Sequence, residues 1–420
     1  MDKFIIRGGR RLRGDVAISG AKNATLPIMA ACLLCEGESR ILGVPEVTDV
    51  VHLSGLLGEL GAEVAREGDG LRLKVVDEQP CHARYDLVRK MRASVCVLGP
   101  LLARRGRARV AMPGGCAIGS RPIDIHLRGL KALGAQLDLK EGDIVATAKR
   151  LRGAEVFLGG AFGSSVTGTA NVMMAASLAA GKTVIEFAAC EPEIEDLANF
   201  LNAMGAKITG AGSPRVIIEG VDRLQATSHR VIPDRIEAGS FMVAAGITNG
   251  EVRLSAARLD HMLAVVDKLR QIGLIIDKAD GGAVVSSNRR ISATDVTTQP
   301  YPGIPTDLQA QLMALLCSAD GNSVITEKIY PDRFMHVAEL GRMGANIRKE
   351  GPTAIVTGVK RLVGAPVMAS DLRASAALVL AGLAAEGETS VSRVYHIDRG
   401  YDRIEQKLAR LGADIQRVNE

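Results

Sequence analysis

The segment 113–122, "PGGCAIGSRP", places a single cysteine among glycines and near a cation. Cys116 follows two glycines and lies five residues before Arg121. Such a composition packs poorly in a core, and a neighbouring positive charge lowers the pKa of a thiol. The pattern predicts an exposed, reactive Cys116, with an inert small hydrophobic residue as the simpler alternative.

Cations at predicted helix starts form a second group of candidates. They are Lys22, Arg92, Arg235 and Arg373. A cation at a helix N-terminus opposes the helix macrodipole and costs about 0.3 to 1 kcal/mol, unless an anion lies between the two. The same helix starts carry Ser, Thr, Asp or Asn, for which N-capping is the ordinary explanation. Several such starts around one cleft would bind phosphate through backbone N–H groups and side-chain cations together.

Two further residues could act on a proton or on a bound anion. Asp307, in "YPGIPTDLQAQ", follows two prolines at a predicted helix start, and Arg399, in "YHIDRGYDR", lies just before the last predicted helix. An N-cap role for Asp307 and a surface ion pair for Arg399 are interpretations of equal weight.

The motifs of several common site types are missing. The chain has no GxxxxGK[ST] motif, no GxGxxG motif after a strand, no HExxH motif and no Cys/His cluster. Cys32 and Cys35 form a CxxC, but the surrounding "LPIMAACLLCEGE" is apolar, and we expect both residues in the core. We therefore expect no metal ion, no cofactor and no classical nucleotide-binding fold.

An internal repeat organises the elements that must position these residues. An amphipathic helix ending in Leu-Gly-Ala, or a close variant, occurs six times at intervals of roughly 70 residues. The glycines of this series are Gly61, Gly134, Gly205, Gly273, Gly344 and Gly412. An interleaved series of apolar helices followed by a glycine and a β-like run has Gly37, Gly106, Gly181, Gly250, Gly321 and Gly387. Each repeat is therefore expected to form a βαβαββ-like unit with a buried helix, an amphipathic helix, a left-handed glycine C-cap and a β-hairpin.

Six repeats predict an α/β fold of two domains with three units each. The last copy stops at "GADIQRVNE" without its hairpin, whereas the first 21 residues contain strand-like sequence and no repeat. We infer that the N-terminal strands complete the C-terminal domain. The predicted domains are residues 22–231, and residues 1–21 together with 232–420. The two crossings between them would form a hinge.

Composition narrows the class of protein. The 420 residues are 47% hydrophobic and 24% charged, with a net charge of +5. No apolar run reaches the roughly 18 residues needed to span a bilayer, and the N-terminus lacks a signal-peptide pattern, so we expect a cytoplasmic protein with no membrane partner. A nucleic-acid-binding repeat protein is an alternative, but near-balanced charge, 3% aromatic residues and no tryptophan disfavour it.

Eight segments, in order, resemble a known family, the UDP-N-acetylglucosamine 1-carboxyvinyltransferases, which are enolpyruvyl transferases. The resemblance covers essentially the whole chain. The segments are "SGAKNATLPIMAA", "MRASVCVLGPLLAR", "PGGCAIGSRPIDIH", "CEPEIEDLANFLNAMGA", "YPGIPTDLQAQ", "RFMHVAELGRMGA", "DLRASAALVLAGL" and "YHIDRGYDRIEQKL".

The resemblance implies a fold and a reaction. The fold is two inside-out α/β barrels, each of three βαβαββ units. In the reaction, which is the first committed step of peptidoglycan synthesis, the enolpyruvyl group of phosphoenolpyruvate moves to the 3′-hydroxyl group of UDP-N-acetylglucosamine. Phosphate leaves by addition and elimination through a tetrahedral ketal. The nearest alternative, a transferase like 5-enolpyruvylshikimate-3-phosphate synthase, is disfavoured by the cysteine loop and by "GAKNATLP".

The resemblance also implies roles for residues around the donor substrate. Lys22 and Asn23 match a pair of which the lysine binds the phosphate of phosphoenolpyruvate. Arg121 and Arg399 match arginines around the same anion. Cys116 matches the loop cysteine that fosfomycin alkylates and that donates a proton to the enolpyruvyl methylene group.

Other matches concern the acceptor. Asp307 matches the carboxylate that takes the proton from the 3′-hydroxyl group, Arg92 matches a residue on the nucleotide-sugar side, and Asp371 and Arg373 match an acid and a base of a family motif. The positions that hold uridine, diphosphate and sugar correspond to Arg121, Pro122, Ile123, Asp124, Ile125, Ser164, Ser165, Val166 and Ile329. Thr167, in "SVTGT", departs from the SVGAT that the family often has. Because threonine resists positive φ, we expect altered backbone geometry there.

Overall fold

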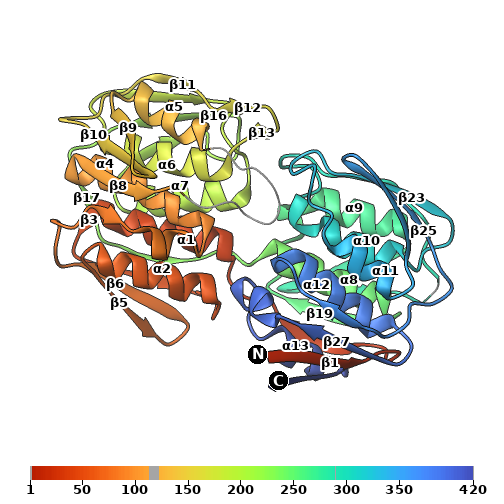
Figure 1. The fold of residues 1–420 in the computed structure, drawn as a ribbon. Helices are drawn as coiled ribbons and strands as arrows, with labels where there is room; N and C mark the ends of the chain where they lie inside the picture. The colour runs from red at the N-terminus through yellow and green to blue at the C-terminus, as the bar shows by residue number, and fades with distance from the viewer. Residues whose placement is uncertain (1, 113–122, 289, 420) are drawn as a thin grey trace. The chain divides into compact units, whose positions relative to one another are not determined.

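The computed structural model describes residues 2–112, 123–288 and 290–419, which form two compact units (Figure 1). We call the described part of residues 20–232 the continuous domain, and residues 2–19 with 233–419 the discontinuous domain. The chain passes from one to the other at 19/20 and at 232/233. The sequence-based boundaries, 21/22 and 231/232, differ from these by two residues and one residue.

The continuous domain contains three repeats. The first has α1 (Lys22–Ala31), η1 (Cys32–Leu34), β3 (Cys35–Glu36), β4 (Glu38–Leu42), α2 (Thr48–Glu59), β5 (Ala62–Glu67) and β6 (Gly70–Val75). The second has β7 (His82–Ala83), α3 (Tyr85–Val88), η2 (Arg92–Val97), α4 (Leu98–Arg105), β8 (Arg107–Ala111), α5 (Asp124–Ala132), β9 (Gln136–Lys140) and β10 (Asp143–Thr147). The third has β11 (Glu155–Phe157), β12 (Gly159–Gly160), β13 (Gly163–Ser164), α6 (Val166–Ala176), β14 (Lys182–Glu186), α7 (Pro192–Ala203), β15 (Lys207–Thr209) and β16 (Arg215–Glu219), followed by β17 (Leu224–Gln225) and β18 (Ser228–Arg230).

The discontinuous domain contains the other three. The fourth repeat has α8 (Arg235–Ile247), β19 (Glu251–Ser255), η3 (Leu259–His261), α9 (Leu263–Ile272), β20 (Ile275–Ala279) and β21 (Gly282–Ser286). The fifth has β22 (Val296–Thr297), η4 (Thr306–Leu308), α10 (Gln309–Leu316), β23 (Asn322–Thr326), α11 (His336–Arg342), β24 (Asn346–Glu350) and β25 (Thr353–Thr357). The sixth has β26 (Pro366–Met368), α12 (Leu372–Ala384), β27 (Glu388–Ser392), η5 (Val394–Arg399), α13 (Ile404–Arg410) and β28 (Asp414–Asn419). Strand β1 (Asp2–Arg7) joins the sheet of the sixth repeat, and β2 (Arg13–Ala17) joins the sheet of the fourth.

Every repeat folds into a four-stranded sheet of one pattern. The orders are β18-β4-β6-β5, β7-β8-β10-β9, β11-β14-β16-β15, β2-β19-β21-β20, β22-β23-β25-β24 and β26-β27-β1-β28. In each sheet the first pair of strands is parallel and the other two pairs are antiparallel. The predicted βαβαββ unit and the α/β fold class are thereby confirmed.

The N-terminal strands lie in two sheets of the discontinuous domain. β2 pairs in parallel with β19, as β18 does with β4 in the continuous domain. β1 lies between β27 and β28, where it pairs Arg7 with Glu388 and Asp2 with Asn419. β1 therefore takes the place that the second hairpin strand takes in the other five sheets.

Apolar helices form the core of each domain. All 13 residues of α8 are buried, and α1, α4, α6, α10 and α12 are similarly rich in buried Ala, Leu and Met. In Figure 1, α8, α10 and α12 occupy the middle of the discontinuous domain, with the sheet strands β1, β27, β23 and β25 toward its outside. The sequence predicts this arrangement because a helix that is apolar all round has no face for solvent.

Left-handed glycines end the amphipathic helices. Their φ values lie between +84° and +116° in all six repeats, as predicted. In the interleaved series the fourth repeat differs, because Asn249 has φ +48° and Gly250 follows it. A Cβ atom on Gly250 would lie 2.4 Å from the carbonyl oxygen of Leu12, so close approach explains this glycine.

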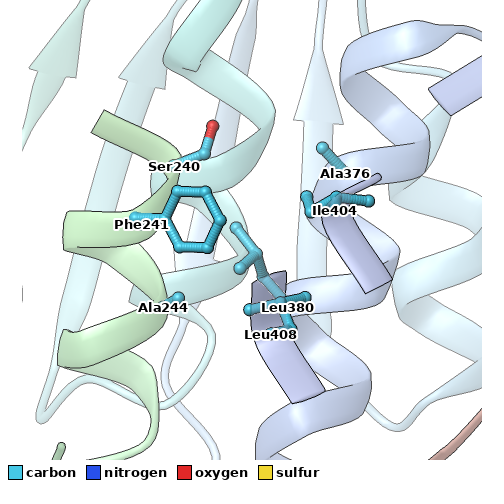
Figure 2. Close-up of a pocket in the computed structure, with 7 residues that line it drawn as sticks. All are labelled: Ser240, Phe241, Ala244, Ala376, Leu380, Ile404 and Leu408. Carbon is cyan, nitrogen blue, oxygen red and sulfur yellow. The ribbon is translucent and has the colours of Figure 1, made fainter. Parts of the chain in front are cut away.

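The discontinuous domain also has a small apolar pocket in its core (Figure 2). Ser240, Phe241, Ala244, Ala376, Leu380, Ile404 and Leu408 line it, from α8, α12 and α13. It is a packing gap without a charged group, so it does not suit an anionic ligand.

Among the described residues, no helix combines the length and apolar character required to cross a bilayer.

Candidate active site

Asp307 is held between two arginines in the discontinuous domain. It lies in η4, at the start of the buried helix α10. Its Oδ1 accepts a hydrogen bond from Arg333 Nη1 at 2.8 Å, and its Oδ2 accepts one from Arg373 Nη2 at 3.0 Å. The side chain of Asp307 is 25% exposed, whereas those of Arg333 and Arg373 are 6% and 2% exposed. This arrangement fixes the orientation of the carboxylate between two positive charges, and a quarter of its side chain stays exposed.

The carboxylate of Asp307 stabilises the charges of the two arginines. Burial opposes the charge on Arg373, but Asp307 and other neighbours outweigh burial, and the pKa of Arg373 is raised. The pKa of Arg333 is raised in the same way, against burial, by Asp307 and Asp371. Tyr401 stacks on Arg373, with 5.2 Å between the guanidinium carbon and the ring centroid. The guanidinium groups are therefore fixed positive charges beside Asp307.

Asp371 is the N-cap of α12. Its Oδ1 accepts from the backbone N–H groups of Arg373 at 2.7 Å and Ala374 at 3.1 Å. The same oxygen lies 4.0 Å from Arg333 Nη2. The structure therefore brings three of the predicted site residues, Asp307, Asp371 and Arg373, into one cluster.

Arg399 and Ile329 belong to the same domain. Arg399 ends η5, next to a half-buried His396. The pKa of His396 is lowered by burial and then by Arg399, while Asp371 opposes the shift, so both residues act on this ring. The backbone N–H of Ile329, after β23, donates to Glu327 Oε1 at 2.8 Å.

Lys22 begins α1 of the continuous domain and has an internal partner. Its Nζ lies 3.3 Å from Asp49 Oδ2 of α2, and the two side chains are 11% and 1% exposed. Asn23 follows in the same first turn. The expectation that a cation at a helix start needs an external anion is thus too strong, because Asp49 supplies part of that charge. Arg235 also has a partner, the ring of Tyr301 at 5.5 Å.

The predicted nucleotide-sugar residues lie at the starts of two adjacent helices. Asp124 and Ile125 begin α5, and Ser165 caps α6 by accepting from Gly168 N at 3.1 Å. A Cβ atom on Gly168 would lie 3.0 Å from Ile125, and one on Gly160 would lie 2.8 Å from it. Missing side chains at these two glycines therefore let the start of α5 approach the segment 160–168, which includes Ser164 and Val166.

A buried histidine that no sequence pattern singles out, His126, links these helix starts. Asn171 Oδ1 accepts from Gly99 N at 2.8 Å, so Asn171 Nδ2 is the donor to His126 Nδ1, also at 2.8 Å. The neutral ring then carries its proton on Nε2 and donates to Thr167 Oγ1 at 3.1 Å. Burial, and then Arg92 at the start of η2, lower the pKa of His126 to about 3.

Thr167 does not distort the backbone. It lies in the first turn of α6 with helical geometry, and it is not one of the residues with positive φ. The expectation of altered geometry was based on a positive φ that Thr167 does not have. The threonine instead gives His126 an acceptor within the same domain.

Cys116, Arg121 and Pro122 lie outside the described residues. Four other cysteines are buried, and burial argues against reactivity of their thiols. Cys32 and Cys35 are buried, as predicted, and burial raises the pKa of both. Burial also raises the pKa of Cys96 and of Cys317 to about 12. Within the described ranges, no group of three or more His, Cys, Asp and Glu side chains could hold a metal ion.

Sequence reasoning missed Arg333, Asp49 and His126. Arg333 lies in one of the segments that carry the resemblance, but no spacing rule ties it to Asp307, 26 residues earlier. Asp49 and His126 lie in amphipathic helices, where a polar residue ordinarily faces solvent. The observation that singles out Asp49 and His126 is their burial, and only the structure shows it.

Comparisons with known proteins add an independent view. The chain matches the family model described as EPSP synthase (3-phosphoshikimate 1-carboxyvinyltransferase) over residues 6–408. Two proteins named UDP-N-acetylglucosamine 1-carboxyvinyltransferase, from Trichlorobacter lovleyi and Anaeromyxobacter sp., are 54% and 57% identical, with 100% of each chain covered. Among solved structures, the enolpyruvyl transferase NikO from Streptomyces tendae has a TM-score of 0.89 at 24% identity, over 100% of this chain and 99% of that one.

Proposed function

Because the chain belongs to the UDP-N-acetylglucosamine 1-carboxyvinyltransferase family, we propose that it transfers the enolpyruvyl group of phosphoenolpyruvate to the 3′-hydroxyl group of UDP-N-acetylglucosamine and releases phosphate. The observation that carries this proposal is identity above one half over the whole length of the relatives. The proposal includes the context that the resemblance implies, which is the first committed step of peptidoglycan synthesis in the cytoplasm.

Asp307 is proposed as the base. The reaction needs a group that takes the proton of the 3′-hydroxyl as its oxygen forms a bond to C2 of the enolpyruvyl group. A carboxylate that is partly exposed, ionised and held by Arg333 and Arg373 suits this task. The two guanidinium groups hold this carboxylate in one orientation, which is what a base that acts on a bound hydroxyl group requires.

Cys116 is proposed as the acid on the other side of this addition. It gives a proton to the methylene carbon, which leaves C2 electron-poor as the sugar oxygen attacks. In the elimination that follows, the C–O bond to phosphate breaks, a proton of the new methyl group returns to the Cys116 thiolate, and the C=C bond forms again. The same thiol is the proposed site of fosfomycin alkylation, so Cys116→Ala should abolish labelling, whereas Cys32→Ala, at a buried thiol, should not.

Cations are proposed to bind the donor and to stabilise the leaving phosphate. Lys22, Arg121 and Arg399 are assigned to this role, with Asn23 beside Lys22. In the continuous domain, Asp49 Oδ2 accepts from Lys22 Nζ at 3.3 Å and so orients the ammonium group. Charge on the leaving oxygens grows in the transition state, so fixed cations accelerate this step.

Acceptor binding is assigned to the helix starts of the continuous domain and to Ile329 and Arg92. Ile123 to Ile125 and Ser164 to Val166 would contact the uridine diphosphate part, because backbone N–H groups at helix N-termini favour anions. The support is their adjacency through Ile125, Gly160 and Gly168.

The test is phosphate release from phosphoenolpyruvate by the purified full chain. Release is expected with UDP-N-acetylglucosamine and not with 3-phosphoshikimate, and mass spectrometry should find the enolpyruvyl ether of the nucleotide sugar. Turnover with 3-phosphoshikimate alone would instead establish the alternative transferase. Turnover with neither acceptor would contradict the proposed function.

A further inference from the structure

Glu327 is a fully buried carboxylate beside the candidate base. It follows β23 in the discontinuous domain and is 0% exposed. Both of its oxygens accept hydrogen bonds: Oε1 from Thr298 Oγ1 at 2.6 Å, and Oε2 from Thr306 Oγ1 at 2.9 Å. A buried carboxylate is costly unless it is fully hydrogen-bonded, so its persistence here calls for an explanation.

The Oε2 atom of Glu327 reaches Asp307 through two residues. The Thr306 hydroxyl donates its one proton to Glu327. Its oxygen therefore acts as the acceptor for Arg333 Nη1 at 3.1 Å. The same Nη1 donates to Asp307 Oδ1 at 2.8 Å. Glu327 therefore sets the direction of the Thr306 hydroxyl, which in turn helps to fix the guanidinium that holds the base.

The Oε1 atom of Glu327 holds a different segment. It accepts from the backbone N–H groups of Ile329 at 2.8 Å and Tyr330 at 3.0 Å. Thr298 strengthens this arm, since its hydroxyl donates to Oε1 and accepts from Lys328 N at 3.0 Å. The segment 328–330 thus depends on one carboxylate oxygen, and the base depends on the other.

We propose that Glu327 is a positioning residue that sets the base Asp307 through Oε2 and the acceptor-binding segment at Ile329 through Oε1. The inference rests on the proposed function. Only a carboxylate accepts on both sides, because glutamine has one oxygen and its amide nitrogen donates. Glu327→Gln should therefore lose one arm, with a fall in kcat/KM for UDP-N-acetylglucosamine of roughly 10- to 100-fold.

A shift in pH dependence separates this relay from mere structural support. Among the described residues, Arg333 and Arg373 donate to Asp307. Asp371 lies 4.0 Å from Arg333, His336 of α11 feels the charges of Asp371 and Arg333, and Tyr401 lies against Arg373. Loosening Arg333 weakens its stabilisation of ionised Asp307, so the base takes up a proton at higher pH. The acidic limb of the kcat profile then moves to higher pH.

Two threonines allow the arms to be tested separately. Thr306→Val should lower kcat roughly tenfold and move the acidic limb to higher pH, while Thr306→Ser should keep both near wild type. Thr298→Val should raise KM for UDP-N-acetylglucosamine roughly three- to tenfold with the acidic limb unmoved. Thr389→Val is the matched control, because the buried hydroxyl of Thr389 has no hydrogen-bond partner within the described residues.

An unmoved acidic limb in Thr306→Val, or Thr306→Ser as impaired as Thr306→Val, would overturn the inference. A second measurement does not depend on turnover. In protein labelled with [13C]aspartate, assigned through Asp307→Asn, the carboxyl of Asp307 should titrate at higher pH in Thr306→Val than in wild type. If the wild type transfers nothing to UDP-N-acetylglucosamine, the proposed function fails, while this titration still decides whether Glu327 acts on Asp307.

Discussion

Each domain buries a polar network at the start of a core helix, and the two networks differ in charge. In the continuous domain, Thr167, neutral His126 and Asn171 are joined by hydrogen bonds without a net charge. In the discontinuous domain, Asp307 lies between Arg333 and Arg373. A neutral network fixes geometry at low desolvation cost, whereas a charged one also holds a proton acceptor ionised. Substitutions in the charged network should therefore affect both chemistry and stability, whereas those in the neutral network should affect mainly stability and binding.

Removing the acceptor oxygen of Asp307 should have the largest effect. Asp307→Asn keeps the shape but cannot take a proton, so kcat should fall about 10²- to 10⁴-fold. Phosphate release at saturating substrates measures it. Asp320→Asn, at a side chain that is 76% exposed, should match wild type. A loss below tenfold at Asp307 would mean that the charged network is not the proton acceptor.

Breaking the buried ion pair should cost stability next. Arg373→Met leaves Asp307 with one guanidinium and should lower the free energy of unfolding by about 3 kcal/mol. Arg373→Lys retains the charge without the planar fork and should fall between the two. Urea unfolding followed by circular dichroism measures both, and equal stability of Arg373→Met and wild type would contradict the comparison.

The neutral network should make the free energy of unfolding depend on pH in the acidic range. The pKa of His126 is lowered to about 3 by burial, whereas the unfolded ring has its ordinary value of 6.5. The unfolded state therefore binds one more proton between these values, and stability falls as the pH falls below 6.5, by about 2 kcal/mol at pH 5. His336, whose pKa is lowered to about 4, adds a similar loss in the discontinuous domain.

His126→Gln retains an N–H donor for Thr167 and removes the titrating ring. Its unfolding free energy should therefore depend less steeply on pH between 7 and 5 than that of wild type. Urea unfolding at both pH values gives the slope. An unchanged slope would show that His126 is charged in the folded protein, and the two networks would then no longer differ in charge.

The smallest effect is expected at Thr167. Thr167→Val leaves the His126 Nε2–H without its acceptor and should cost about 1 kcal/mol. Thr183→Val is the control in the same domain, because the buried hydroxyl of Thr183 has no hydrogen-bond partner among the described residues. Thermal unfolding of both variants tests the difference. Equal melting temperatures would remove Thr167 from the network.

The sequence predicts the repeats well because their signals are local. A glycine with φ near +90° after an amphipathic helix, such as Gly134, follows from backbone sterics alone. The missing hairpin of the last repeat also points to the N-terminal strands, since a sheet of this pattern lacks one strand there. Neither inference needs knowledge of side-chain contacts.

The networks were beyond sequence reasoning because their partners are distant and irregularly spaced. Arg333 and Arg373 meet Asp307 from a loop and from another repeat, and His126 meets Thr167 and Asn171 across 41 and 45 residues. Nothing in periodicity sets such distances. The resemblance supplied Asp307 and Arg373, but the hydrogen bonds that orient them come only from the packing of helix starts.

Strand β1 has a consequence for how the chain is made. Residues 2–7 leave the ribosome long before their partners do, because Arg7 pairs with Glu388 and Asp2 with Asn419. At synthesis rates of about 5 to 20 residues per second, this strand waits roughly 20 to 80 s for its neighbours. The continuous domain, whose sheets are closed by its own strands, has all its partners much earlier. During translation β1 therefore exposes unpaired backbone N–H and C=O groups, and a chaperone that shields this strand should matter more than one that acts after release.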